Sequence, residues 1–233
     1  MISSDNKTNT FTEEGRILQV EYAIKNVSKG GTIIGMVCQD GVILMGLKKG
    51  SIQKQNEKIY KISNEIYSAI CGTFSDALQL IGYGRLKAQE FQEEMDAPIP
   101  LSTFCRQIGE LKQAFTQGGG MRLFGVSLLY AGMMNGEYCL YSTDPSGTYT
   151  KWKAMAYGEN EDAINSAFKN DLPNEEMNME RGFKEILKIL VKVRECGRKD
   201  VPKMEILFYN SGKNIIVEEE YIYKIFDELS IGL

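Results

Sequence analysis

The chain of 233 residues contains no histidine. Histidine is the usual general base beside serine and cysteine nucleophiles, and it is the side chain that most commonly ligates metals. Its absence excludes the Ser-His-Asp and Cys-His mechanisms together with histidine-rich metal sites. Few hydrolase mechanisms therefore remain open for this sequence.

Cysteine is scarce and does not occur in closely spaced pairs. The five cysteines, an odd number without any C-x-x-C motif, are Cys38, Cys71, Cys105, Cys139 and Cys196. This pattern argues against a disulfide framework and against a zinc site. We therefore expect buried free thiols and no bound metal.

The glycine motifs of nucleotide-binding proteins are incomplete. Gly41 to Gly46 begins like a phosphate-binding loop, but Leu47 occupies the place of the lysine that must reach the phosphates. Gly82 and Gly84 form a G-x-G pair inside a helical pattern, without the third glycine of the dinucleotide motif. We expect an ordinary strand and a helix-packing site at these positions, and no cofactor.

A basic excess and long apolar runs are also missing. The net charge is -4 and the pI is about 5.2, which argues against nucleic acid as a partner. No apolar run approaches the roughly 18 to 20 residues that span a bilayer, so we expect no membrane segment and an intracellular chain. A hydrophobic content of 43% with 25% charged residues is close to the globular average and predicts a single domain.

The hydrophobic periodicity predicts an α+β fold. Thr12, followed by Glu13 and Glu14, predicts the start of a first helix that ends at Gly30-Gly31. Strands are predicted at 32–38, 42–47, 58–62, 65–71, 123–132, 137–142, 148–157, 204–209 and 214–219, and further helices at 74–94, 101–115, 161–170, 175–195 and 219–229. Hairpin-linked strands interrupted by helix pairs indicate antiparallel sheets with helices layered outside them.

One histidine-free mechanism remains, in which an N-terminal threonine uses its own α-amine as the general base. Thr32 directly follows Gly30-Gly31, and Lys58 is available from the next hairpin. The mechanism also requires a free amine on the threonine and an acid that tunes the site. The position of that acid decides between a peptidase and an inactive relative.

The stretch FTEEGRILQVEYAIKNVSKGGT resembles the N-terminal signature of the α-type subunits of the proteasome family. The residues that carry this resemblance are Phe11, Gly15, Arg16, Gln19, Val20, Glu21 and Tyr22. The stretches KQAFTQGGGMRLFGVSLLYAG and LYSTDPSGTYTKWKAMAYG are similar to the eukaryotic subunit in the third position of the α-ring. The likeness extends from about Ser4 to the last helix, which is nearly the whole chain.

The resemblance implies a four-layer αββα sandwich of two antiparallel sheets between helical layers. This is the N-terminal nucleophile hydrolase fold with an extra α-type N-terminal helix. It implies a gate segment at residues 1–11 and a single domain at 12–233. Matching Gly41-Val42-Ile43-Leu44 to the second strand of a catalytic β-type subunit places the catalytic acid's position at Leu47, which carries no charge. Thr32 is not N-terminal either, so the resemblance implies a non-catalytic chain.

By the same resemblance, the chain contributes to ring assembly, pore gating and activator docking in ubiquitin-dependent protein degradation, in the cytoplasm and nucleus. The implied partners are neighbouring α subunits, β-ring subunits, and the C-terminal tails of regulatory-particle ATPases or other activators. Lys58, Gly30 and Gly72 correspond to the pocket that takes such a tail. The family's tyrosine-aspartate-x-arginine gate motif reads Ser4-Asp5-Asn6-Lys7 here, so Asp5 and Lys7 keep its acid and base.

Two alternatives stay open from the sequence. An autoprocessed β-type threonine peptidase would expose Thr32, but Leu47 and the intact helix signature weigh against it. A free-standing scaffold of the same fold, outside any particle, would share every feature described above.

Overall fold

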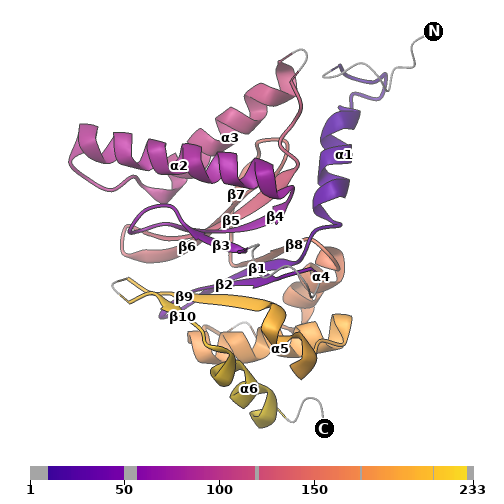
Figure 1. The fold of residues 1–233 in the computed structure, drawn as a ribbon, viewed down its shortest axis with the longest axis vertical. Coiled ribbons are helices and arrows are strands. Elements are labelled where there is room, and N and C mark those ends of the chain that lie inside the picture. The colour runs from indigo at the N-terminus through magenta and orange to yellow at the C-terminus, as the bar shows by residue number, and fades with distance from the viewer. Residues whose placement is uncertain (1–9, 50–56, 119–120, 174, 212, 230–233) are drawn as a thin grey trace.

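The computed structural model describes residues 10–49, 57–118, 121–173, 175–211 and 213–229, and within them the fold has four layers (Figure 1). Two antiparallel five-stranded sheets are stacked face to face, and we name them the upper and the lower sheet by their places in Figure 1. Helices α2 (Phe74–Met95) and α3 (Leu101–Gln117) cover the upper sheet. Helices α4 (Glu161–Asp171), α5 (Met179–Arg194) and α6 (Glu219–Glu228) cover the lower sheet.

The strand order places hairpin partners side by side in both sheets. The lower sheet has the order β10-β9-β2-β1-β8, formed by Ile215–Ile216, Met204–Tyr209, Gly41–Leu47, Ile33–Cys38 and Ala154–Tyr157. The upper sheet has the order β3-β4-β5-β6-β7, formed by Ile59–Lys61, Tyr67–Gly72, Val126–Met134, Glu137–Thr143 and Tyr149–Trp152. The predicted hairpin at Asp40-Gly41 is confirmed, because Cys38 of β1 pairs with Gly41 of β2. The predicted sandwich of antiparallel sheets between helical layers is confirmed as well.

Strand β2 shows how the sequence builds this core. Every residue of β2 is buried, because both faces of the lower sheet are covered. Val42 and Leu44 point into the layer between the two sheets, whereas Ile43 and Met45 point into the core between the lower sheet and the helices that cover it. Strand side chains alternate between faces, so one apolar run supplies two separate cores.

The predicted strand at 148–157 is wrong as a single element. Tyr149–Trp152 forms β7 at the edge of the upper sheet, and Ala154–Tyr157 forms β8 at the edge of the lower sheet. The chain crosses between the sheets at Lys153, whose carbonyl accepts a hydrogen bond from the Val37 N–H at 2.8 Å. Polar and apolar residues alternate across the crossing in Lys151-Trp152-Lys153-Ala154, so this stretch of the sequence contains no sign of the break.

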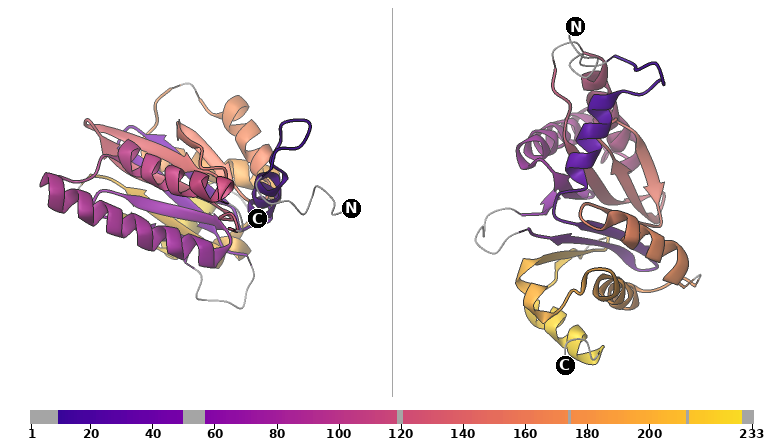
Figure 2. Two further views of the ribbon diagram at one scale, coloured as in Figure 1. Left: turned by 90° about the horizontal axis from the view of Figure 1, so that it is seen from above. Right: turned by 90° about the vertical axis from the view of Figure 1, so that its right-hand side faces the viewer.

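The predicted start of the first helix is also wrong. Helix α1 spans Leu18–Val27, and the residues from Thr12 to Gly15 form a turn in which the Gly15 N–H donates to the Thr12 carbonyl at 2.9 Å. Gly15 has φ +76°, a left-handed conformation that interrupts a helix and that glycine adopts without steric cost. In the right-hand view of Figure 2, α1 (indigo) and α6 (yellow) lie toward opposite ends of the molecule.

Two further boundaries differ from the prediction. Helix α5 begins at Met179 rather than near residue 175, because the Asn178 side chain caps it by accepting the Arg181 N–H at 2.9 Å. Strand β10 is limited to Ile215–Ile216 at the sheet edge.

All five cysteines are buried free thiols, as the sequence predicted. Among the described helices, none has the length and apolar character needed to cross a membrane.

Candidate functional site

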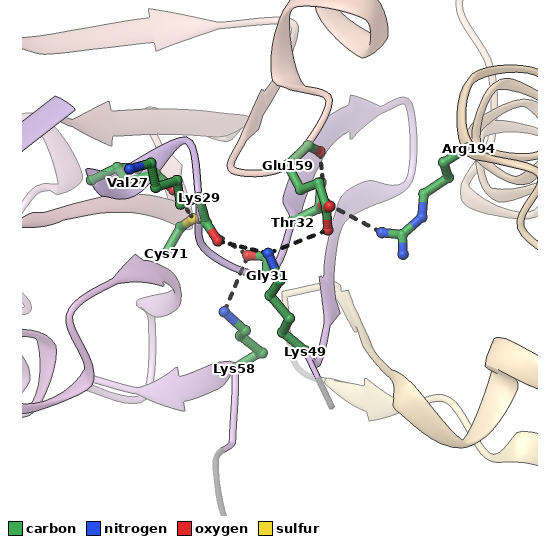
Figure 3. Close-up of polar contacts among 9 residues, drawn as sticks. All are labelled: Val27, Lys29, Gly31, Thr32, Lys49, Lys58, Cys71, Glu159 and Arg194. Carbon is green, nitrogen blue, oxygen red and sulfur yellow. Dashed lines mark hydrogen bonds and ion pairs between the residues drawn. The ribbon is translucent and has the colours of Figure 1, made fainter. Parts of the chain in front are cut away.

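The Gly30-Gly31 segment joins α1 to β1, and Thr32 follows it inside the molecule (Figure 3). Thr32 is fully buried, and its hydroxyl donates to the Glu159 carbonyl at 2.9 Å. The Thr32 carbonyl accepts the Leu47 N–H at 2.8 Å, which continues the pairing of β1 with β2. With its amine in a peptide bond and its hydroxyl used in a hydrogen bond to the backbone, Thr32 has a structural role directly before β1.

Leu47 lies at the end of β2 and is buried in the core beneath the lower sheet. Its carbonyl passes close to Gly31, where an added Cβ would lie only 2.3 Å from the Leu47 oxygen. That distance requires glycine at position 31, because no larger residue fits without moving the backbone. Packing alone therefore explains one of the two glycines in front of Thr32.

Lys58 directly precedes β3 and extends its side chain toward the Gly30-Gly31 segment. Its Nζ donates to the carbonyls of Gly31 at 3.1 Å and Ile70 at 3.3 Å. Burial lowers the pKa of the Lys58 ammonium, and the nearby Glu205 carboxylate opposes that shift. Among the described residues Lys58 forms no ion pair, so one of its three donors is left for an incoming acceptor.

A cavity of about 230 Å³ opens beside this lysine and brings the three predicted pocket residues together. Lys58, Gly30 and Gly72 all line it. At Gly30 an added Cβ would lie 3.0 Å from the Cys71 Sγ, and at Gly72 it would lie 2.2 Å from the Gly125 carbonyl. The packing of the chain itself thus requires glycine at position 72 and crowds any side chain at position 30, whatever the cavity binds.

Two lining residues, Lys48 and Lys49, were missed by the sequence reasoning. Lys48 forms an ion pair with Glu205 at 3.2 Å, whereas Lys49 donates to the Lys29 carbonyl at 3.0 Å. The signal that could have identified them is their position directly after the end of β2, beside the start of β1. With Lys58 they give the cavity three cationic side chains against the one carboxylate of Glu57 among its lining residues, and this positive excess favours an anion.

Cys71 also lines the cavity, and its surroundings make it unreactive. Its Sγ lies 3.3 Å from the Gly31 carbonyl and 3.5 Å from the Val27 carbonyl. Burial raises the pKa of the Cys71 thiol to about 12, although Lys58 acts in the opposite direction. A thiol with such a pKa carries almost no thiolate near neutral pH and is a poor nucleophile.

The signature residues gather on α1 and on the turn before it, away from the cavity. Arg16 forms a bidentate ion pair with Glu21, which connects the turn before α1 to the first part of that helix. Phe11 is 74% exposed and Tyr22 is 44% exposed. Gln19 and Val20 are half-buried on the same helix. The predicted gate residues Asp5 and Lys7 lie outside the described residues.

Family comparisons cover nearly the whole chain. The proteasome subunit family matches residues 27–204, and the N-terminal signature of the A-type proteasome subunits matches residues 5–25. The probable alpha type-3 proteasome subunit of Encephalitozoon cuniculi is 51% identical over 96% of this chain and 96% of its own length. The alpha type-3 proteasome subunit of Saccharomyces cerevisiae is 35% identical over 95% of this chain and 87% of its own.

The alpha type-4 proteasome subunit of Spinacia oleracea is 38% identical over 87% of this chain and 83% of its own length. The agreement includes the leading signature and both sheets, so it covers the features that separate the α-type from the β-type. This chain belongs to the proteasome subunit family as a non-catalytic α-type subunit.

Proposed function

We propose that this subunit forms part of the wall and gate of the proteasome α-ring and binds the C-terminal carboxylate of an activator in the Lys58 cavity. The observation that carries the docking role is the Lys58 ammonium, which donates to two neutral carbonyls and keeps a donor for a ligand. A carboxylate is the natural acceptor for such a group, because it neutralises the charge and accepts a strong hydrogen bond from it.

The absence of threonine chemistry is supported by three features of this chain. The position that matches the catalytic acid holds Leu47, which is buried in a hydrophobic core. Thr32 lacks a free amine, and its hydroxyl donates to a backbone carbonyl. Lys58 alone resembles the catalytic set, and without an acid and a free threonine amine it has no nucleophile to tune.

Ring assembly is supported by the exposed apolar side chains of α1. Tyr22 and Ile24 are 44% and 40% exposed, and α1 buries little except Val27. Neighbouring α subunits would cover such a helix face, as the resemblance implies, while β-ring subunits would bind elsewhere on the chain.

We place the chain in the third position of the ring and, with the assembled particle, in the cytoplasm and nucleus. A fluorescent fusion that marks a different compartment would contradict this localisation.

The docking proposal is tested by Lys58→Ala in the assembled particle. We expect the ring to assemble normally, while a synthetic peptide with the C-terminal sequence of a regulatory-particle ATPase binds the variant chain about ten- to a hundredfold more weakly. That range corresponds to about 1.5 to 3 kcal/mol for a hydrogen bond between charged groups. Crosslinking of a photoreactive version of the peptide to this chain, measured as a function of concentration, separates this pocket from the others in the ring.

Lys61→Ala is the matched control, since Lys61 is an exposed lysine on the neighbouring strand β3 and does not line the cavity. We expect its crosslinking curve to match that of the unaltered particle. Equal peptide affinity in the Lys58→Ala and unaltered particles would remove the docking role from this cavity.

A further inference from the structure

Glu205 lies on β9 of the lower sheet and binds the start of β3 in the upper sheet. Its Oε2 accepts the Lys58 N–H at 2.9 Å, and its Oε1 accepts the Ile59 N–H at 3.0 Å. β3 is an edge strand of the upper sheet, so none of the described strands lies on its outer side to receive these donors. One carboxylate therefore takes the place of a neighbouring strand and links the two sheets at Lys58.

Lys48, which lines the cavity, balances the charge of Glu205. Lys48 approaches Glu205 Oε2 to 3.2 Å, and both side chains are largely buried, with exposures of 25% and 19%. A carboxylate at this place would otherwise repel a second carboxylate entering the cavity. Because Lys48 neutralises Glu205, the Lys58 ammonium keeps its attraction for an anionic ligand.

The side-chain stem of Lys58 is held from the opposite side. Gly46 on β2 pairs with Glu205 in the sheet register, and a Cβ at Gly46 would lie 2.4 Å from the Lys58 Cβ. The missing side chain at position 46 thus leaves the space that the Lys58 stem occupies. With its backbone bound by Glu205 and its stem packed over Gly46, Lys58 has little freedom to move its ammonium away from the cavity.

We propose that Glu205 is the positioning residue of the pocket: it holds Lys58 in the place where the ammonium meets the ligand's terminal carboxylate. This inference rests on the docking function proposed above and adds to it a residue that does not touch the ligand. Glu205 acts through the backbone of Lys58, so its effect depends on the carboxylate end of the ligand and not on the rest of the peptide.

Glu205→Gln in the assembled particle tests the inference. The glutamine keeps the shape of the side chain, but it places an NH₂ donor against one of the two backbone N–H groups and loses the ion pair with Lys48. The probes are the photoreactive ATPase-tail peptide as a free acid and the same peptide with an amidated C-terminus. For the unaltered chain we expect the acid to crosslink at lower concentration than the amide.

The preference for the acid is the ratio of the amide concentration to the acid concentration at half-maximal crosslinking. Glu205→Gln should reduce this ratio by about tenfold, while the concentration dependence of the amide stays unchanged. In the Lys58→Ala background, the same change should have no further effect on the preference. Glu185→Gln is the matched control, because Glu185 is 21% exposed and pairs with Lys188 on α5. It should leave the preference intact.

Three results overturn the inference in different ways. If Glu205→Gln keeps the full preference while Lys58→Ala loses it, Glu205 does not position Lys58 and the docking function stands. If the unaltered particle shows no preference, the docking function fails and the inference fails with it. If Glu205→Gln lowers the affinity for acid and amide equally, Glu205 has only a structural role.

Incorporation of each variant is verified by native mass spectrometry. Should Glu205→Gln fail to assemble, Glu205→Asp provides the second measurement. Its carboxylate keeps the charge but is one methylene too short to accept both backbone donors, so the preference should fall. An unchanged preference in the Asp variant would contradict positioning.

Discussion

Lys112 of α3 is fully buried, and its side chain lies between that helix and the upper sheet. Its Nζ donates to the carbonyls of Val126 at 3.0 Å and Thr143 at 3.2 Å, and to the Thr143 hydroxyl at 2.9 Å. The Tyr130 hydroxyl lies 2.9 Å from the same Thr143 oxygen. Burial lowers the pKa of Lys112 to about 7, although Asp144 acts in the opposite direction. Such a network makes the stability of the folded chain depend on pH.

The pKa of Lys112 is about 7 in the folded chain and about 10.5 in the unfolded chain, and this difference sets the sign of the pH dependence. Between pH 7 and about 10.5 the unfolded chain binds the Lys112 proton and the folded chain does not, so the free energy of unfolding rises with pH. The slope is at most about 1.4 kcal/mol per pH unit. Lys112→Met should lack this rise. Urea unfolding of both purified chains, followed by the fluorescence of Trp152, measures the difference, and parallel curves would refute it.

An activity test at Thr32 decides between the α-type and the peptidase interpretation. A chain truncated to begin at Thr32 should stay inactive on peptide substrates, because Leu47 cannot supply the tuning acid. The same truncated chain with Thr32→Ala gives the background rate. We also expect the intact mass of the subunit from purified particles to include the residues before Thr32. Turnover above the background would show that the strand register assigned to Leu47 is wrong.

At the scale of elements, β8 depends on a side chain of α4 for its outer edge. Asn165 accepts the Ala156 N–H at 2.9 Å and donates to the Ala156 carbonyl at 3.0 Å. The amide therefore pairs with the outer edge of β8 as another strand would. This contact also blocks the edge against pairing with another chain.

Asn165→Ala should lower the free energy of unfolding by about 1 to 3 kcal/mol, because it leaves two partly buried backbone groups without a partner. Asn170→Ala on the same helix is the control, since Asn170 is exposed, and it should change stability by less than about 0.5 kcal/mol. Chemical denaturation of the three purified chains provides the comparison. Equal losses in both variants would mean that helix propensity, rather than the edge contact, sets the cost.

At the scale of the whole molecule, α1 connects the N-terminal signature to the cavity. The helix ends at Val27, and the Gly30-Gly31 segment that follows it forms one wall of the cavity. Ser28 donates to Glu161 at the start of α4, and Lys49 forms an ion pair with Glu159 at 3.8 Å. Lys49 also donates to the Lys29 carbonyl at 3.0 Å, so the base of α1 is bound to the cavity and to α4.

Deleting residues 1–11 should raise the basal peptide hydrolysis of the assembled particle, because the resemblance assigns this segment to the gate. The double variant Asp5→Ala with Lys7→Ala should raise it less, since exposed ion pairs are each worth under about 1 kcal/mol. Hydrolysis of a small fluorogenic peptide without activator measures both effects. A rate equal to that of the unaltered particle after the deletion would exclude the gating role.

Local patterns in the sequence were sufficient for much of this protein. The hairpin at Asp40-Gly41, the helices with apolar positions at helical spacing and the antiparallel layering depend on neighbours within a few residues. Turn chemistry and amphipathic periodicity record such contacts directly. The α-type signature likewise identified the class of subunit, and the cavity residues Lys58, Gly30 and Gly72 followed from the resemblance.

Tertiary structure decided everything that depends on partners distant in the sequence. Lys58 and Glu205 are 147 residues apart, and no local pattern marks Glu205 as the acceptor for the start of β3. The division of residues 148–157 between two sheets has the same origin, because periodicity reports which residues face a core but not which sheet supplies the partner strand. The sequence by itself determined most of the elements and the class of subunit, whereas the geometry around Lys58 exists only after both sheets have packed together.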